Sequence, residues 1–222
     1  MIYKPAFITF TGVDEHTSLL GMETLARKYP VEWGVLFSPT RIGGRYPPIE
    51  WVAKTFGSVC GPLALSAHLC GGHSRDLIKT GELSNSLLSA LISAFFQRVQ
   101  INTTDPDVNP ARLLTWARGL KAAPILQCRG PFPFESSAAW LFDASGGRGE
   151  EPEDWPHAPR ETARMIGYAG GLNPDNVRAH VERISLVASN YWIDMESGVR
   201  DDNDRFDLDK CRRVCEAVYG AR

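Results

Sequence analysis

Two glycine-containing loops near the C-terminus have the composition of a phosphate-binding site. Gly170-Gly171 follows one short β-type run, and Ser197-Gly198 follows the next. Because glycine has no Cβ, backbone N–H groups at these positions can approach an anion closely. A helix that begins near Ser197 would add the positive end of its dipole. We expect these loops to hold the phosphate of a small ligand; the alternative is that the glycines only make tight turns between strand and helix.

Asp143, Thr11 and His68 are the candidates for proton transfer, because each lies at or near the end of an apolar β-type run. Barrel enzymes place catalytic groups at the carboxyl ends of their strands, so we expect Asp143 to face the ligand; a turn-forming role is the alternative. The hydroxyl of Thr11 has a pKa far above neutrality and cannot act as a base unless another group activates it. The imidazole of His68 could accept a proton, and a purely structural role is its open alternative.

Arg45 and Asn102 are candidate ligand contacts. The planar guanidinium of Arg45 suits a carboxylate, to which it can donate two parallel hydrogen bonds; a solvated loop arginine is the alternative, and Arg41 lies close by. Gln100 and Asn102 share one face of a strand, because strand side chains alternate. They form either a buried hydrogen-bond network or ligand contacts, and Asn102 is the better ligand candidate because it comes last in the strand.

The elements that position these residues follow one another in a regular order. Short β-type runs alternate with helical patterns along the chain, which is typical of parallel βαβ units. The expected strands are 6–11, 33–37, 63–69, 97–102, 123–127, 139–143, 166–169 and 191–194, and the expected helices are 17–28, 84–94, 110–119, 174–188 and 207–219. Eight strands predict a (β/α)8 TIM barrel as a single domain over residues 1–222, with a doubly wound open sheet as the alternative. Two prolines and a glycine in 128–138 allow only a short or irregular fifth helix.

The composition excludes several classes of function. A net charge of -2 over 222 residues offers no basic surface for nucleic acid or acidic membranes. The chain has no apolar run of membrane-spanning length and no pattern of a signal peptide. Its five cysteines are scattered and odd in number, which indicates reduced thiols in a cytoplasmic protein. We expect a monomer or homodimer without a cofactor.

A metal site is one further interpretation of the segment that contains His68, Cys70 and His73. Tetrahedral zinc needs more ligands than this local cluster offers. We therefore expect no metal. The run 200–205, which is rich in Asp and Arg, predicts a solvated loop.

Several motifs, in chain order, resemble those of the phosphoribosylanthranilate isomerase family of tryptophan biosynthesis. Ser38-Pro39 followed by Gly44-Arg45-Tyr46 is similar to its Ser-Pro-Arg-Tyr loop, and Val99-Gln100-Ile101-Asn102 to its Val-Gln-Leu-His strand. The closer matches lie from about Leu141 onward. They are Leu141-Phe142-Asp143 with Gly146-Gly147-Arg148-Gly149 and Asp154-Trp155, then the loops 169–177 and 193–199, the latter with Met195-Glu196 where Val-Ser is usual.

This resemblance implies a (β/α)8 barrel that binds a phosphorylated sugar derivative. Asp143 matches the family's general acid, which protonates the ribose ring oxygen in an Amadori rearrangement. Arg45 matches the arginine that contacts the anthranilate carboxylate, and Thr11 stands where the family has its cysteine base. The leading hypothesis is an aldose–ketose isomerase whose base is left open, with His68 as the first candidate. The alternative is a catalytically inactive paralogue that binds a phosphorylated ligand or acts in regulation.

Overall fold

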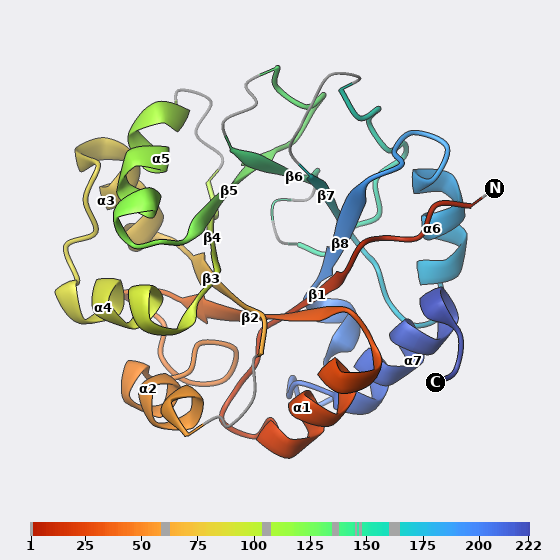
Figure 1. Cartoon of the computed structure of the whole chain (residues 1–222), viewed down its shortest axis with the longest axis horizontal. Coiled ribbons are helices and arrows are strands. Elements are labelled where there is room, and N and C mark those ends of the chain that lie inside the picture. The colour runs from red at the N-terminus through yellow and green to blue at the C-terminus, as the bar shows by residue number, and fades with distance from the viewer. Residues whose placement is uncertain are drawn as a thin grey trace.

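The computed structural model describes residues 2–58, 63–103, 108–134, 138–144, 146, 148–159 and 165–222 of the chain. Within this part, eight parallel strands close into a barrel in the order of the sequence, and β1 pairs with both β2 and β8. The helices lie outside the ring of strands (Figure 1). The fold is therefore the expected (β/α)8 TIM barrel.

Every expected strand is present, with ends that differ from the predicted ones by at most two residues. The strands are β1 Ile8–Thr11, β2 Val31–Phe37, β3 Leu65–Leu69, β4 Arg98–Ile101, β5 Ala123–Cys128, β6 Ala139–Asp143, β7 Ile166–Ala169 and β8 Tyr191–Met195. The helices are α1 Leu19–Lys28, α2 Ile49–Gly57, α3 Gly72–Thr80, α4 Ser86–Phe95, α5 Pro110–Gly119, α6 Val177–Ile184 and α7 Leu208–Tyr219. Ser197–Val199 form a single turn of 3₁₀ helix, η1, at the position where a helix start was expected.

The sequence patterns do not predict α2 and α3. Two prolines directly precede α2, although it buries Val52 and Phe56 one turn apart. α3 is polar, and its buried side chains are His73, Ser74 and Leu77, so it shows no apolar stripe. Between β5 and β6 the described residues 129–134 and 138 contain no helix, in agreement with the irregular fifth unit; residues 135–137 lie outside the described part.

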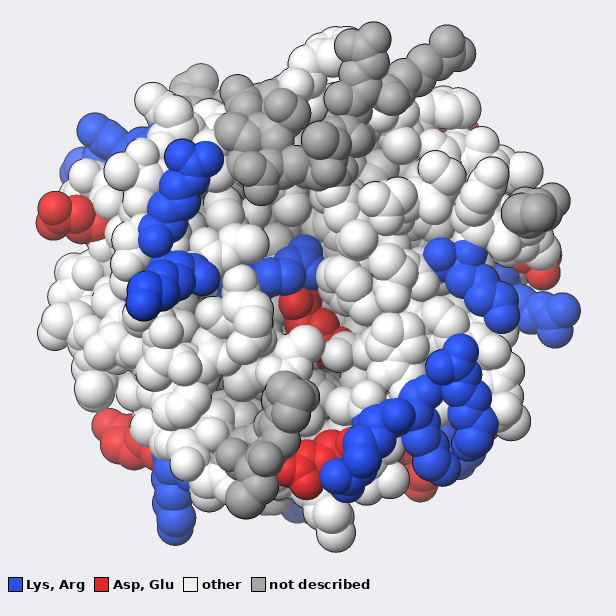
Figure 2. Space-filling model, viewed as in Figure 1, with Lys and Arg blue, Asp and Glu red and all other residues white. Residues whose placement is uncertain are grey.

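Charged and aromatic groups fill the N-terminal end of the barrel interior. The carboxylate of Glu32 accepts a hydrogen bond from Thr9 Oγ1 at 2.8 Å and pairs with Arg98 Nη1 at 3.2 Å. The Arg98 guanidinium in turn lies 4.2 Å from the ring centre of Trp192. Figure 2 shows acidic and basic side chains next to one another in the hollow at the centre of the molecule. Since these side chains fill the N-terminal end of the barrel interior, the pocket inside the barrel lies at the carboxyl ends of the strands.

No helix in the described part of the chain is long and apolar enough to cross a lipid bilayer. Cys70, Cys128, Cys211 and Cys215 are free thiols, whereas Cys60 lies outside the described residues.

Candidate active site

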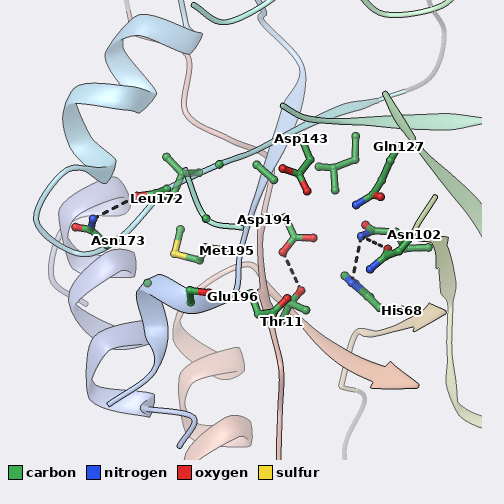
Figure 3. Close-up of a pocket in the computed structure, with 18 residues that line it drawn as sticks. Thr11, His68, Asn102, Gln127, Asp143, Leu172, Asn173, Asp194, Met195 and Glu196 are labelled. Atoms are coloured by element: carbon green, nitrogen blue, oxygen red, sulfur yellow. Dashed lines mark hydrogen bonds between the residues drawn. The ribbon is translucent and has the colours of Figure 1, made fainter. Parts of the chain in front are cut away.

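A pocket of about 300 Å³ opens at the carboxyl ends of the strands. Eight of the nine predicted site residues line it, namely Thr11, His68, Asn102, Asp143, Gly170, Gly171, Ser197 and Gly198. In the close-up their side chains and loops surround one common space (Figure 3). Arg45 is the exception, because its side chain ends beside the pocket. The volume is at the lower end of the range for small-molecule sites.

The two glycine loops lie against each other at one end of this pocket. Gly171 has a φ of +63°, and a Cβ there would lie 2.8 Å from the backbone nitrogen of Glu151. A Cβ on Gly198 would overlap the carbonyl oxygen of Leu172, which belongs to the other loop. Only glycine therefore permits this approach of the two backbones. Gly147, part of the third matched motif, lies outside the described residues.

Asp143 is buried at the last position of β6. Its Oδ1 accepts a hydrogen bond from the backbone nitrogen of Gly146 at 3.0 Å, so Asp143 shapes the turn, as in the alternative interpretation, and also lines the pocket. The strand register places Asp143 opposite Ala169, and Ala169 opposite Asp194 on β8. Two carboxyl groups thus stand in one row of the barrel with a small residue between them.

Asp194 is the site residue to which the sequence patterns assign no role. Thr11 Oγ1 donates a hydrogen bond of 2.8 Å to Asp194 Oδ1 (Figure 3). Both side chains are buried, and burial raises the pKa of Asp194 to about 8, against the hydrogen bond from Thr11, which lowers it. The sequence signal that could have found this residue is a carboxylate inside the apolar run Tyr-Trp-Ile-Asp-Met, since a buried charge needs a partner or a function.

His68 is held by its neighbours on β4. Its Nδ1 lies 3.2 Å from Gln100 Nε2, which also donates to Asn102 Oδ1 at 2.9 Å. Burial lowers the pKa of His68 to about 3, so the imidazole is neutral and a weak base. Among the described residues, His68 Nε2 and Gln100 Oε1 are buried without a hydrogen-bond partner. Two unsatisfied polar atoms on the pocket wall are groups that a ligand could satisfy.

Gly34 on β2 leaves room for side chains from both neighbouring strands. A Cβ on Gly34 would lie 2.5 Å from Thr11 Oγ1 and 3.0 Å from His68 Nε2. Only glycine therefore lets Thr11 and His68 approach the same space from β1 and β3.

Asn102 belongs to the hydrogen-bond network as well as to the pocket. Its Nδ2 lies 3.3 Å from Cys70 Sγ, and burial raises the pKa of this thiol to about 12. The described residues contain no group of three His, Cys, Asp or Glu side chains placed to hold a metal ion, and His68, Cys70 and His73 do not form one.

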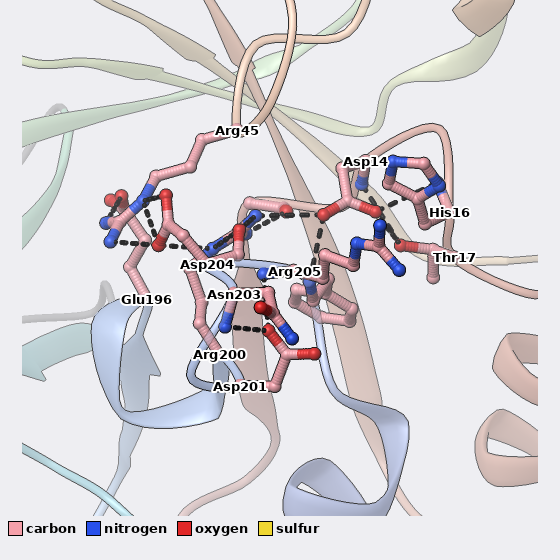
Figure 4. A network of polar contacts seen from close by, with 12 residues as sticks. Asp14, His16, Thr17, Arg45, Glu196, Arg200, Asp201, Asn203, Asp204 and Arg205 are labelled. Carbon is pink, nitrogen blue, oxygen red and sulfur yellow. Dashed lines mark hydrogen bonds and ion pairs between the residues drawn. The ribbon is translucent and has the colours of Figure 1, made fainter.

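Arg45 lies at the phosphate end and is already paired. Its Nη1 donates to Glu196 Oε1 at 2.7 Å and to Ser197 Oγ at 3.1 Å, and its Nη2 to Asp204 Oδ1 at 2.6 Å (Figure 4). Glu196 lines the pocket, and burial raises its pKa against the opposing effect of Arg45. The carboxylates of Glu196 and Asp204 thus occupy the guanidinium that was expected to contact a ligand carboxylate.

Arg200 corrects the expectation of a solvated loop over 200–205. Its guanidinium is buried and donates to the carbonyl oxygen of Gly12 at 2.7 Å and to Asp14 Oδ2 at 2.8 Å. It also pairs with Asp204 at 3.0 Å. A buried cation needs such partners, and here they tie the loop after β8 to the loop after β1 (Figure 4).

Residues 132–217 match the sequence profile of N-(5'-phosphoribosyl)anthranilate (PRA) isomerase. A curated relative of that name from Geobacter sp. (strain M21) is 39% identical over 101 residues, which are 40% of this chain and 47% of the relative. The matched stretch thus spans less than half the length of the relative. The resemblance indicated by the motifs is confirmed for this C-terminal part of the chain.

Solved structures extend the likeness in fold to the whole chain. The structure of TrpF from Jonesia denitrificans has a TM-score of 0.65 and 16% identity, over 96% of this chain and 97% of that one. A PRA isomerase in complex with reduced 1-(o-carboxyphenylamino)-1-deoxyribulose 5-phosphate has a TM-score of 0.60 and 15% identity over the full length of both chains. At such identities the likeness shows the barrel fold.

Proposed function

We propose that the protein is an isomerase of a phosphorylated ribosylamine, of the PRA isomerase type. In this reaction an acid protonates the ring oxygen of an N-substituted ribose 5-phosphate, and the opened chain rearranges to an aminoketose. Asp143 is the acid in this proposal, and the loops of Gly170-Gly171 and Ser197-Gly198 hold the phosphate. Asn102 and His68 contact the sugar, which lies between Asp143 and the phosphate loops.

The observation that carries the proposal is the convergence of Asp143 and both glycine loops on one pocket. The acid and the anion site come from β6, β7 and β8, which are neighbours in the barrel. A phosphate held at the loops therefore leaves the sugar beside Asp143. The C-terminal likeness to PRA isomerase covers these same three strands, which supports the assignment.

Turnover of PRA by the purified protein tests this function. We expect formation of the aminoketose product by the unmodified protein, and loss of at least a hundredfold in kcat for Asp143→Asn, since a carboxamide cannot donate the proton. Asp209→Asn on α7 is the matched control, because that carboxylate is 85% exposed and outside the pocket lining. Absence of turnover by the unmodified protein would refute the proposal.

One observation favours the second candidate, a ligand-binding protein without activity. Thr11 stands at the position of the family's base, and a threonine hydroxyl is not a base by itself. Binding of ribose 5-phosphate without turnover of PRA would establish this alternative. If calorimetry detected neither binding nor turnover, both functions would fall.

A further inference from the structure

The proposed isomerase needs a base that takes the proton from C2 of the opened sugar. This inference rests on the proposed function, and it concerns the side of the pocket where Thr11 ends β1. Two strands, β7 and β8, separate Asp143 on β6 from this side, and Asp143 has the role of acid. The base must therefore be one of the other titratable groups that line the pocket.

His68 and Glu196 in the pocket lining, and the thiol of Cys70 beside Asn102, are poor candidates. Burial lowers the pKa of His68 to about 3, so its imidazole holds a proton too weakly. Burial raises the pKa of Cys70 to about 12, so its thiol remains protonated. Glu196 is bound to Arg45 at 2.7 Å, and this guanidinium competes for the carboxylate.

Asp194 has the geometry that the reaction requires. It lies in the pocket lining, its Oδ1 is 2.8 Å from Thr11 Oγ1, and one strand separates it from Asp143. We propose that Asp194 is the general base of this pocket, and that Thr11 is a positioning residue that holds its carboxylate towards the sugar. Asp194 on β8 thus takes the role of base that the PRA isomerase family gives to a cysteine at the position of Thr11, on the neighbouring strand β1.

The surroundings of Asp194 give its carboxylate a high proton affinity. Burial is the largest cause, and the negative charges of Glu32 and Glu196 also raise its pKa. The hydrogen bond from Thr11 and the positive charge of Arg98 act in the opposite direction. The result is a pKa of about 8, close to the range in which a general base works best near neutral pH.

Protons and electrons balance over the whole rearrangement when these two carboxyl groups carry out the proton transfers. Asp143 gives its proton to the ring oxygen, the C1–O bond breaks, and an iminium forms between C1 and nitrogen. Asp194 takes the proton from C2, the C2–H electron pair becomes the C1=C2 double bond, and the iminium electrons return to nitrogen. Asp194 then delivers its proton to C1 while the enol hydroxyl gives its proton to Asp143. Both residues end as they began, and the product is the aminoketose.

His68 has a different task in this step. Its Nδ1 faces the amide nitrogen of Gln100, which only donates, so the proton of the neutral ring belongs on Nε2. Nε2 is buried without a hydrogen-bond partner among the described residues, and it lies 3.0 Å from the position that a Cβ on Gly34 would occupy. It can therefore donate to the C2 oxygen when the enol hydroxyl gives its proton to Asp143 and negative charge develops on that oxygen.

The first arm of the test is PRA turnover by Asp194→Asn. We expect at least a thousandfold loss of kcat, with the affinity for inorganic phosphate changed less than twofold in calorimetry, because the carboxamide keeps the shape and can still accept from Thr11. Retention of a tenth of the wild-type kcat would overturn the assignment of Asp194 and leave the proposed function intact. Absence of turnover in the unmodified protein would overturn both.

The second arm is the pH profile of kcat/KM for Thr11→Val. In the wild type we expect activity to rise with pH through about 8, as Asp194 ionises. Loss of the Thr11 hydrogen bond removes a cause that lowers this pKa, so the profile moves to higher pH and the activity is regained there. A purely structural defect would lower the rate equally at every pH, and that result would overturn the positioning role.

Thr9→Val is the matched control for the second arm. Thr9 Oγ1 makes the same kind of buried hydrogen bond, of 2.8 Å, to Glu32 Oε1 in the layer below, outside the pocket lining. We expect its pH profile to move less than that of Thr11→Val. An equal displacement in both variants would show that the effect does not depend on Thr11 itself, and would also count against the proposal.

Discussion

Glu196→Gln should strengthen the binding of phosphate, because Glu196 places a carboxylate beside the proposed anion site. Glu196 Oε1 and Ser197 Oγ contact the same nitrogen, Arg45 Nη1, at 2.7 and 3.1 Å, so the carboxylate lies within about 6 Å of the phosphate loop. Its side chain is 27% exposed, so solvent screens it only in part.

The size of the effect follows from Coulomb's law. One unit charge at about 6 Å repels another by about 0.7 kcal/mol in water and by about 2.8 kcal/mol at an effective dielectric constant of about 20. These limits correspond to a gain in affinity between about threefold and about a hundredfold. Loss of the ion pair also leaves Arg45 free to turn to the phosphate, which acts in the same direction.

Calorimetry with inorganic phosphate at low and at high salt measures this change, which salt should reduce. Glu182→Gln is the matched control, because Glu182 makes a comparable ion pair, with Arg178 at 3.5 Å, on α6. Unchanged or weaker phosphate binding by Glu196→Gln, with the control unaffected, would refute the reasoning. Arg45→Met should weaken phosphate binding; if it raised only the KM for PRA, Arg45 would contact the aromatic half instead.

Three further variants test the structure around the pocket. Gly198→Ala should destabilise the fold by about 1–3 kcal/mol and abolish phosphate binding in calorimetry, because the new Cβ overlaps the carbonyl oxygen of Leu172. Arg200→Met should cost about 3–5 kcal/mol in urea unfolding, because it leaves the buried carboxylate of Asp14 without its oppositely charged partner; a loss under 1 kcal/mol would contradict this. Asp194→Asn should gain stability relative to the wild type as pH rises from about 4 to 8, by up to about 1.4 kcal/mol per pH unit. The sign follows from the raised pKa of Asp194: over this range the folded wild type keeps the carboxyl protonated while the unfolded chain is ionised, so wild-type folding takes up a proton and becomes less favourable as pH rises. A difference constant with pH would contradict it.

The barrel could be predicted because its strands are local patterns. Runs such as 139–143 and 166–169 are apolar, short and bounded by turn residues, and the structure confirms both with the same bounds. α3 could not be predicted in this way, because its buried face contains His73 and Ser74, and Ser74 Oγ donates to the carbonyl oxygen of Leu69 on β3. Periodicity reports only those helices whose buried face is apolar.

The site was predictable as far as it depends on the ends of strands. Thr11, Asp143 and the glycine loops each end or follow a β-type run, so closing the barrel brings them to one pocket. The pairing of Arg45 with Glu196 could not be foreseen, because the two residues meet only when the loop after β2 folds over the end of β8. Asp204 joins them from a third segment, and no spacing in the sequence encodes that contact.

The sequence by itself determined most of the chemical groups that reach the pocket, because strand periodicity and chain order place the carboxyl ends of all eight strands on one face of the barrel. Only the tertiary structure decided the state of those groups. Thr11 and Asp194 are 183 positions apart in the chain and 2.8 Å apart in the fold. The pKa of Asp194 rises and that of His68 falls because burial and charges from several strands act together on each group. Proton affinity is a property of the surroundings, and those surroundings exist only in the closed barrel.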